Sequence, residues 1–288
     1  MALTRYLDQQ QAGPALPYGT ETMNGRLAES TLWRYRYFIL TSIQSDFRAR
    51  VARSRLGMFW IVLAPLSQVV IYAFVLSSLM SQRLPGIETP FAYSIYLMAG
   101  FQAWFLFTEI LTRCLNVFIE NGNALKKISF PRMALPVIAV GAAILNNLIF
   151  FVLVIAAYLL VGYHPGWSLA WFPVLLLVTS ALATGLGLVL GILNVFMRDV
   201  GQLVAILLQF GFWLTPIVYT IDILPERFQD IIRLNPMFWV VDNYHRVLAY
   251  GVAPNLIALG LVAGLAVILL WLALVLFRKA SGEIVDVL

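Results

Sequence analysis

The sequence has little charge, almost no cysteine or histidine, and no common catalytic motif. Of its 288 residues, 11% are charged and 61% are hydrophobic, whereas a soluble domain has about 25% charged residues. The 14% of aromatic residues excludes a disordered chain. One cysteine, Cys114, excludes a disulfide framework, and two histidines leave little scope for zinc chemistry. We therefore expect an integral membrane protein without a metal site.

Six apolar stretches are long enough to cross a bilayer, for which a helix needs about 20 apolar residues. They lie at 57–80, 91–111, 135–161, 171–193, 203–218 and 256–277. The fifth is short and ends near Thr215-Pro216. The first begins only after residue 56, so we expect a span there and not a cleaved signal peptide. The predicted fold is all-α, with six transmembrane helices in a domain at 56–288.

Basic residues are distributed unevenly about these spans. Of the 19 lysines and arginines, only Arg83, Arg227, Arg233 and Arg246 lie on the side opposite the N-terminal segment. The positive-inside rule therefore predicts that both termini are cytoplasmic. The same rule accounts for the net charge of +5, so the excess of basic residues does not indicate a nucleic-acid partner.

The segment before the first span has two parts. Residues 1–26 contain several glycines and prolines and are expected to be a flexible cytoplasmic arm. In 27–55, apolar residues recur every three or four positions and share one helical face: Trp33, Tyr37, Leu40, Ile43, Phe47 and Val51. We expect an amphipathic helix at the membrane surface, anchored by arginines. The alternative is a cytosolic helix that packs against another protein.

Two segments between spans are too distinctive for simple connectors. The predicted cytosolic loop 112–134 is long and contains a short helical candidate between Asn/Gly residues and Pro131; it either docks a partner or is a solvated connector. The segment 219–255 on the opposite side is strongly apolar, and Pro225 and Pro236 divide it into two short helices. We expect these to re-enter the bilayer or act as a gate.

Polar groups are sparse inside the spans. Glu109 and Arg113 form an i,i+4 pair, either a helix-interface pair or a substrate or proton site. Asn146 and Asn147 favour hydrogen bonding between helices, and the small residues Ala183, Gly187 and Gly191 favour close helix packing. The shortage of other buried charges argues against a proton-coupled carrier or an ion channel with a charged ring.

An aromatic stripe runs along the second span. Tyr93, Tyr96, Trp104 and Phe107 are spaced to share one helical face. Such a stripe either packs in the interior or stacks on sugar rings, whose hydroxyl groups also suit neutral partners such as Gln68 and Tyr72. A neutral aromatic wall suits a carbohydrate path better than an ion path.

Several segments together resemble one family. They are RSRLGMFW at 53–60, APL at 64–66, SFPR at 129–132, NVFMRDV at 194–200, LTPIVY at 214–219 and LNPM at 234–237. In these segments, within about 30–277, the chain resembles ABC-2-type permeases that export polysaccharides such as O-antigen, capsule and teichoic acid. The resemblance implies a homodimer with two copies of a separate ATPase in the bacterial inner membrane. ATP and Mg would bind that partner, and the cargo would be a glycan on a lipid carrier.

The resemblance also implies roles for particular residues. The cytosolic loop would contact the ATPase through Glu120, Asn121, Asn123, Lys126 and Lys127. Arg48, Arg50, Arg53 and Arg55 would meet either the carrier phosphate or lipid headgroups. The path would be lined by Gln68, Tyr72 and the aromatic stripe, and an outer gate would include Pro216, Tyr219, Asn235 and Pro236. The alternative function is an ABC-2 permease for a lipid or drug; a membrane enzyme is disfavoured because no convincing set of paired acids is found.

Overall fold

The computed structural model describes residues 37, 39–45, 63, 66–67, 91–122, 133–280 and 282–283. All of these lie in one compact unit, Tyr37–Leu288. The regular elements of the described part are helices: α5 (Ala92–Glu120), α7 (Ala134–Leu160), η1 (Gly166–Trp171), α8 (Phe172–Phe196), α9 (Asp199–Leu214), η2 (Ile221–Ile223), α10 (Glu226–Arg233), α11 (Pro236–Tyr244), η3 (His245–Ala249) and α12 (Leu256–Ala280). The all-α prediction is confirmed for these ranges.

Four helices in the described ranges are long and apolar enough to span a membrane: α5, α7, η1 continuing into α8, and α12. They correspond to the second, third, fourth and sixth predicted spans. Residues 57–80 of the first predicted span lie outside the described part, except for Leu63, Leu66 and Ser67. The arm at 1–26 also lies outside it, and of 27–55 only residues 37 and 39–45 are described, as helix.

The fifth apolar stretch forms a helix of the predicted length that lies four residues closer to the N-terminus than predicted. We expected 203–218, but α9 begins at Asp199 and ends at Leu214, and Thr215 is extended. Pro216 explains the early end, because a proline ring disfavours helical backbone at the preceding residue. The linker 215–220 that follows α9 is therefore not helical.

Helix α5 continues beyond its predicted end at residue 111. The stretch up to Glu120 keeps apolar side chains on one side, and Cys114, Leu115, Val117 and Phe118 are buried. The Phe118 ring also stacks on Phe277 of α12, with ring centroids 5.6 Å apart. Packing therefore extends the helix into the predicted loop.

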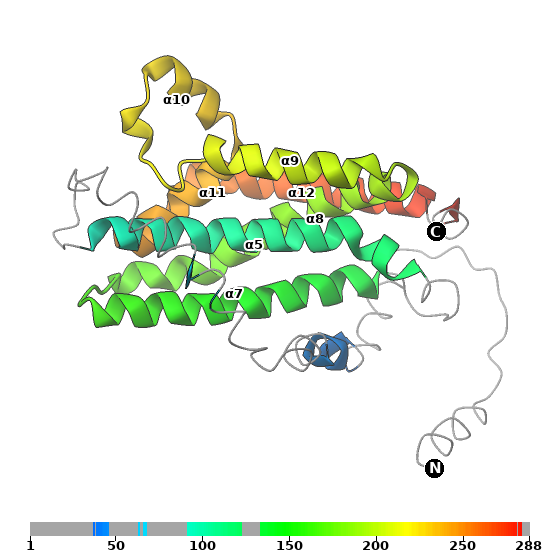
Figure 1. The fold of residues 1–288 in the computed structure, drawn as a ribbon, viewed down its shortest axis with the longest axis horizontal. Helices are drawn as coiled ribbons and strands as arrows, with labels where there is room; N and C mark the ends of the chain where they lie inside the picture. Colours follow the sequence, from blue (N-terminus) through cyan, green and yellow to red (C-terminus); the bar gives the residue numbers. More distant parts are fainter. Residues whose placement is uncertain are drawn as a thin grey trace, which may run out of the picture. The chain divides into compact units, whose positions relative to one another are not determined.

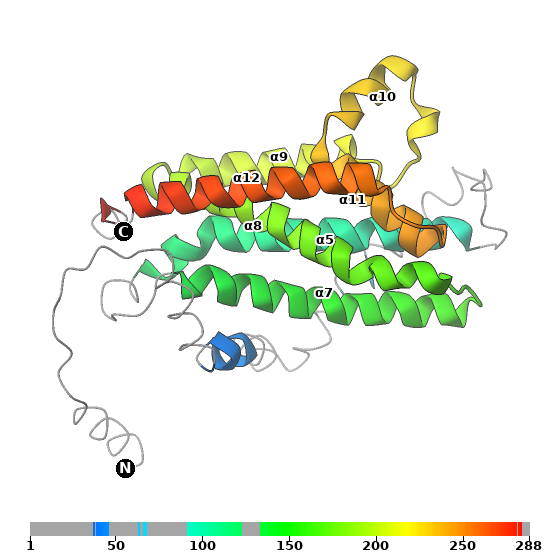
Figure 2. The same ribbon diagram turned by 180° about the vertical axis from the view of Figure 1, so that it is seen from behind.

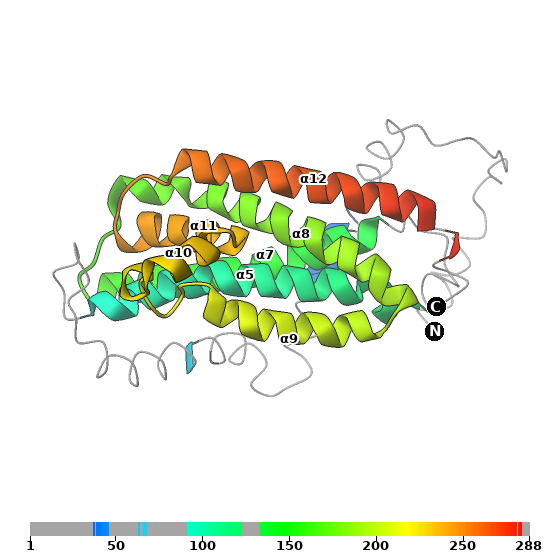
Figure 3. The same ribbon diagram turned by 90° about the horizontal axis from the view of Figure 1, so that it is seen from above.

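The long helices lie alongside one another, with α5 and α8 in the interior (Figures 1 and 3). Helix α5 packs against α7 and α8, and α8 packs against α12. The most apolar span, α12, is the least buried in the chain, whereas the least apolar, α5, is the most buried. This inverse order is expected where the outer helices face lipid. Figure 2 shows α10 standing apart from the long helices at the end where α5 begins.

Small residues let α8 approach its neighbours closely. A Cβ added at Gly187 would lie 2.8 Å from Cys114 Cβ, and one added at Gly191 would lie 2.5 Å from the Cys114 carbonyl oxygen. Gly185 meets α12 in the same way, at 2.8 Å from Leu269 Cβ. The predicted close packing at Gly187 and Gly191 is confirmed.

Both predicted asparagines join α7 to α5: Asn146 bonds to Glu109, and Asn147 bonds to Gln102 in the interior. Gln102 Nε2 donates to Asn147 Oδ1 at 2.8 Å, and Asn147 Nδ2 donates to the Gln102 carbonyl oxygen at 3.1 Å. Both side chains are buried. The reciprocal bonds fix the two helices in register, as predicted for Asn147.

Candidate functional site

The linker 215–220 is held against α5 by two tyrosines. Tyr93 Oη donates to the Val218 carbonyl oxygen at 2.8 Å. Tyr96 Oη is shared between the carbonyl oxygens of Tyr219 at 3.0 Å and Pro216 at 3.3 Å. Because the linker is not helical, its carbonyl groups have no helical partners, and the tyrosines bond to three of them. Tyr96, predicted to line a path, is therefore hydrogen-bonded to two predicted gate residues, Pro216 and Tyr219. Tyr93, from the same predicted path, bonds to Val218 between them.

Asn235 holds the far end of the same region. Its Nδ2 donates to Thr215 Oγ1 at 3.0 Å, and its Oδ1 accepts from Met237 N at 3.0 Å. The second bond is an N-cap, and Pro236 occupies the first position of α11, where its missing N–H costs no helical bond. The predicted gate residues Pro216, Tyr219, Asn235 and Pro236 thus lie in one hydrogen-bonded region; their role as a gate stays a prediction.

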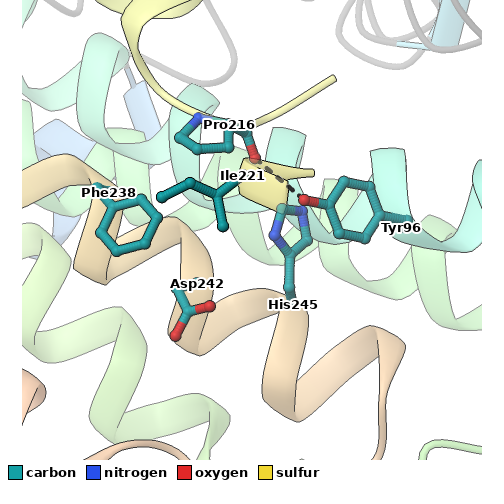
Figure 4. A pocket seen from close by; sticks show the side chains of 6 residues that line it. All are labelled: Tyr96, Pro216, Ile221, Phe238, Asp242 and His245. Carbon is teal, nitrogen blue, oxygen red and sulfur yellow. Dashed lines mark hydrogen bonds between the residues drawn. The ribbon is translucent and has the colours of Figure 1, made fainter. Parts of the chain in front are cut away.

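A small cavity of about 30 Å³ lies beneath the linker (Figure 4). Figure 4 shows Tyr96 of α5 beside His245 of η3, with Pro216 and Ile221 above them and the α11 side chains Phe238 and Asp242 opposite. The rings of Tyr96 and His245 stack with centroids 3.7 Å apart. This volume is sufficient for about one water molecule.

His245 is buried at the centre of this arrangement. Its side chain is 3% exposed, and Nε2 has no hydrogen-bond partner in the described part of the chain. A Cβ added at Gly100 would lie 2.8 Å from that nitrogen, so the absence of a side chain at Gly100 makes room for the imidazole. The ring is thus fixed by shape and stacking.

Burial shifts the pKa values of two groups of the cavity in the direction that disfavours charge. Desolvation by burial lowers the pKa of His245 to about 3, although a hydrogen bond to the Tyr96 backbone opposes this. Burial raises the pKa of Asp242, and the nearby Arg246 charge partly offsets that effect. Among the described residues, no cluster of three or more His, Cys, Asp or Glu side chains is placed to hold a metal ion.

Of the remaining residues of the predicted stripe, Trp104 packs against α9. Trp104 and Phe107 are buried, and the Trp104 ring lies edge-on to Phe212 of α9, with centroids 5.9 Å apart. A Cβ added at Gly211 of α9 would lie 3.3 Å from the Trp104 ring. Helix α9 therefore covers the Trp104 ring. Gln68 and Tyr72, predicted to line the same path, lie outside the described residues.

The predicted pair of charges in α5 is present and includes α7. Arg113 Nη2 donates to Glu109 Oε1 at 2.7 Å, and Asn146 Nδ2 of α7 donates to the same oxygen at 2.6 Å. The carboxylate is thereby bound to a cation and a neutral donor within the bundle. The geometry is that of an interface between helices, the first of our two interpretations.

Two of the predicted ATPase contacts are described. Glu120 is the exposed last residue of α5, and Asn121 caps that helix through a bond from Nδ2 to the Val117 carbonyl oxygen at 2.8 Å. The other predicted contacts and the arginines expected to bind phosphate lie outside the described residues: Asn123, Lys126, Lys127, Arg48, Arg50, Arg53 and Arg55.

Several residues of the cavity could not be predicted from the sequence. His245 was noted only as one of two histidines, and Asp242, Phe238 and Ile221 were read as parts of an apolar segment. Their partners on α5 are distant in sequence, so no local spacing indicates the contact. The one local signal in the sequence is the predicted helix start at Asn235-Pro236. The helix that begins there carries Phe238 and Asp242.

Comparison with known proteins agrees with this architecture. The family described as ABC-2 type transporter matches residues 37–249. An O-antigen export system permease protein RfbA of Myxococcus xanthus is 25% identical over 257 residues, 88% of this chain and 96% of that protein. Another of the same name, from Klebsiella pneumoniae, is 29% identical over 220 residues, 76% of this chain and 83% of that protein. The polysialic acid transport protein KpsM of Escherichia coli is 22% identical over 238 residues, 81% of this chain and 89% of that protein. Because the family match covers most of the sequence, this multi-pass membrane protein belongs to the ABC-2 type transporter family.

Proposed function

We propose that this chain is the membrane subunit of an ATP-driven exporter that moves a lipid-linked polysaccharide from the cytoplasm across the bacterial inner membrane. The observation that carries the proposal is the set of relatives, which are named as permeases or transport proteins for O-antigen and polysialic acid and align along most of this chain. The neutral, aromatic interior of the bundle agrees with a carbohydrate cargo.

The proposed complex contains two copies of this chain and two copies of a separate ATPase, which binds ATP and Mg. This division agrees with a sequence that lacks a phosphate-binding loop. Both termini then face the cytoplasm, as the basic residues predict. Glu120 and Asn121 at the end of α5, followed by Asn123, Lys126 and Lys127, are the proposed ATPase contacts. Glu120 is exposed, as such a contact requires.

In the proposed transport cycle, Arg48, Arg50, Arg53 and Arg55 attract the carrier phosphate from the inner leaflet. Movement of α9 away from Trp104 then uncovers the aromatic stripe, and sugar rings stack on it beside Gln68 and Tyr72. The tyrosine bonds to Pro216 and Tyr219 close the outer end between cycles. The described structure, with Trp104 buried against α9, corresponds in this proposal to a closed state.

The direct test is to purify the chain with the ATPase that accompanies it and to measure ATP hydrolysis. Lipid-linked glycan extracted from membranes of the same cells should stimulate hydrolysis, and the stimulating sugar can then be identified. Lipid extract treated to remove the glycan is the control. If no ATPase co-purifies, or if the glycan-free lipid stimulates equally, the proposal is wrong.

Leucine substitutions distinguish a sugar cargo from a lipid or drug cargo. Replacing Trp104 and Phe107 by leucine keeps the wall apolar but removes the rings. Tyr93 is left unchanged in this test because its hydroxyl group also holds the linker. A glycan exporter should lose transport, whereas an exporter of hydrophobic molecules should keep it. Phe150→Leu on α7 is the matched control, because its ring packs against Phe105 away from the stripe.

A further inference from the structure

Asn194 is a buried polar residue near the end of α8 that bonds to two other helices. Its side chain is 2% exposed. Nδ2 donates to the Leu115 carbonyl oxygen of α5 at 3.3 Å and to Asn116 Oδ1 at 3.4 Å. Oδ1 accepts from the Gly201 N–H of α9 at 2.9 Å. One amide thus joins α5, α8 and α9.

The bonds to α5 lie beside a close contact between α8 and α5. Gly191 of α8 packs on the backbone of Cys114 and Leu115, with an added Cβ 2.5 Å from the Cys114 carbonyl oxygen. Because the two backbones are in direct contact, the ends of α5 and α8 are expected to move together. From Asn116, α5 continues without interruption to Glu120, where the proposed ATPase contacts begin. A displacement of this end of α5 must therefore move Asn194.

The bond to α9 replaces the usual cap of that helix. The N-cap residue Arg198 makes no side-chain capping bond, and the Gly201 N–H has only a longer contact of 3.3 Å to the Arg198 carbonyl oxygen. Asn194 therefore caps α9 from the preceding helix. The buried side chains of α9 are Val204 and Phe212, both beyond its first turn. The Asn194 bond is therefore a buried polar attachment of the N-terminal end of α9.

We propose that Asn194 is a positioning residue that transmits displacement of the α5 end to α9, the helix that covers Trp104. The inference rests on the proposed function, because it assigns a route by which an ATPase at Glu120 uncovers the aromatic stripe. Without the Asn194 amide, α5 can still respond to the ATPase, but α9 no longer follows. We expect the variant complex to assemble and to hydrolyse ATP, but with less glycan transported for each ATP hydrolysed.

The test compares Asn194→Ala with Asn147→Ala in the complex with the ATPase. Both asparagines are buried and bridge helices, but Asn147 joins α5 only to α7. The assay uses inverted membrane vesicles from cells whose own lipid-linked polysaccharide is radiolabelled. It measures glycan transported and ATP hydrolysed. For Asn194→Ala, we expect glycan transported per ATP to fall about fivefold or more, in the range of measured coupling between sites. ATP hydrolysis should persist, and Asn147→Ala should keep the wild-type ratio.

Gly201→Ala is a second, milder variant that keeps the Asn194 side chain. Its added Cβ would lie 3.1 Å from Asn194 Oδ1 and 3.4 Å from Nδ2, so the amide must shift. We expect an intermediate ratio, which also provides the test if Asn194→Ala does not assemble. If Asn194→Ala and Gly201→Ala keep the wild-type ratio, or if Asn147→Ala lowers it equally, the role of Asn194 is wrong. If the wild-type complex moves no glycan, the proposed function itself is wrong.

Discussion

At the scale of single residues, His245 is the clearest case of a group whose properties depend on burial. The imidazole stacks on Tyr96. Its pKa is lowered to about 3 because burial removes the water that would stabilise the charged form. In the unfolded chain the same group titrates near its ordinary value of 6.5. Between these two values the unfolded chain binds a proton that the folded chain does not, so stability rises with pH in this window and falls as the solution is acidified.

This difference predicts a measurable acid sensitivity. Between pH 7 and pH 5.5, His245 should lower the free energy of unfolding by about 1 kcal/mol through protonation of the unfolded state. His245→Gln should remove that part of the slope in thermal melts of the detergent-solubilised protein. Asp242, whose raised pKa gives a slope of opposite sign at lower pH, is present in both proteins and does not affect the comparison. An unchanged slope in His245→Gln would show that the imidazole is not buried as neutral histidine.

Gly100 gives a second residue-scale prediction. An alanine there would place Cβ 2.8 Å from His245 Nε2 and 3.2 Å from the Ile217 carbonyl oxygen. Since both belong to a packed region, we expect Gly100→Ala to destabilise the protein by about 1–3 kcal/mol. Gly264→Ala is the control, because nothing lies within 4 Å of its added Cβ. It should be neutral or slightly stabilising, since alanine favours a helix. Equal melting temperatures for the two variants would refute the assigned packing.

At the scale of elements, the contact between α5 and α8 depends on glycine. A leucine at Gly191 would collide with the Cys114 carbonyl oxygen, which is part of a helix backbone and cannot move alone. We expect Gly191→Leu to separate the helices and to reduce the yield of folded protein strongly, measured by size-exclusion chromatography. Gly260→Leu on α12 meets no atom within 4 Å of its added Cβ and should keep the wild-type yield. Similar yields for both would show that α8 does not approach α5 as described.

The sequence could predict those features that depend on residues close together in the chain. The helices at the second, third, fourth and sixth spans follow from apolar length, and the Glu109–Arg113 pair follows from one helical turn. The extension of α5 to Glu120 was missed because it depends on contacts with α8 and α12. The stacking of Tyr96 on His245 was also missed, since periodicity identifies the face of a helix but not the partner on that face.

The aromatic stripe shows the same limit at the candidate site. Spacing correctly places Tyr96, Trp104 and Phe107 along α5, and all three are buried. What spacing could not provide is the element that covers them, because an apolar stripe fits either a helix or a ligand. The structure supplies α9 and the linker as that cover. The proposed sugar contacts therefore require a movement of α9, which the spacing of residues along α5 could not indicate.

At the scale of the whole molecule, the uneven distribution of basic residues determines the predicted orientation. Arg233 of α10 and Glu283, after α12, lie on opposite sides of the last span, so one of them must face the outside. Each can be changed to cysteine in a Cys114→Ala background. A membrane-impermeable maleimide applied to spheroplasts should label the Arg233→Cys protein at once. It should label the Glu283→Cys protein only after the membrane is opened.

The detergent-solubilised proteins serve as the control, because both cysteines should then react. The Arg233 side chain is 48% exposed, so burial within the chain would not explain slow labelling of a cysteine at this position. The opposite pattern, with the tail labelled from outside, would place the end of α5 and Glu120 on the wrong side for a cytoplasmic ATPase. It would refute the positive-inside orientation and the proposed ATPase contacts together, because both require that end of the bundle to face the nucleotide.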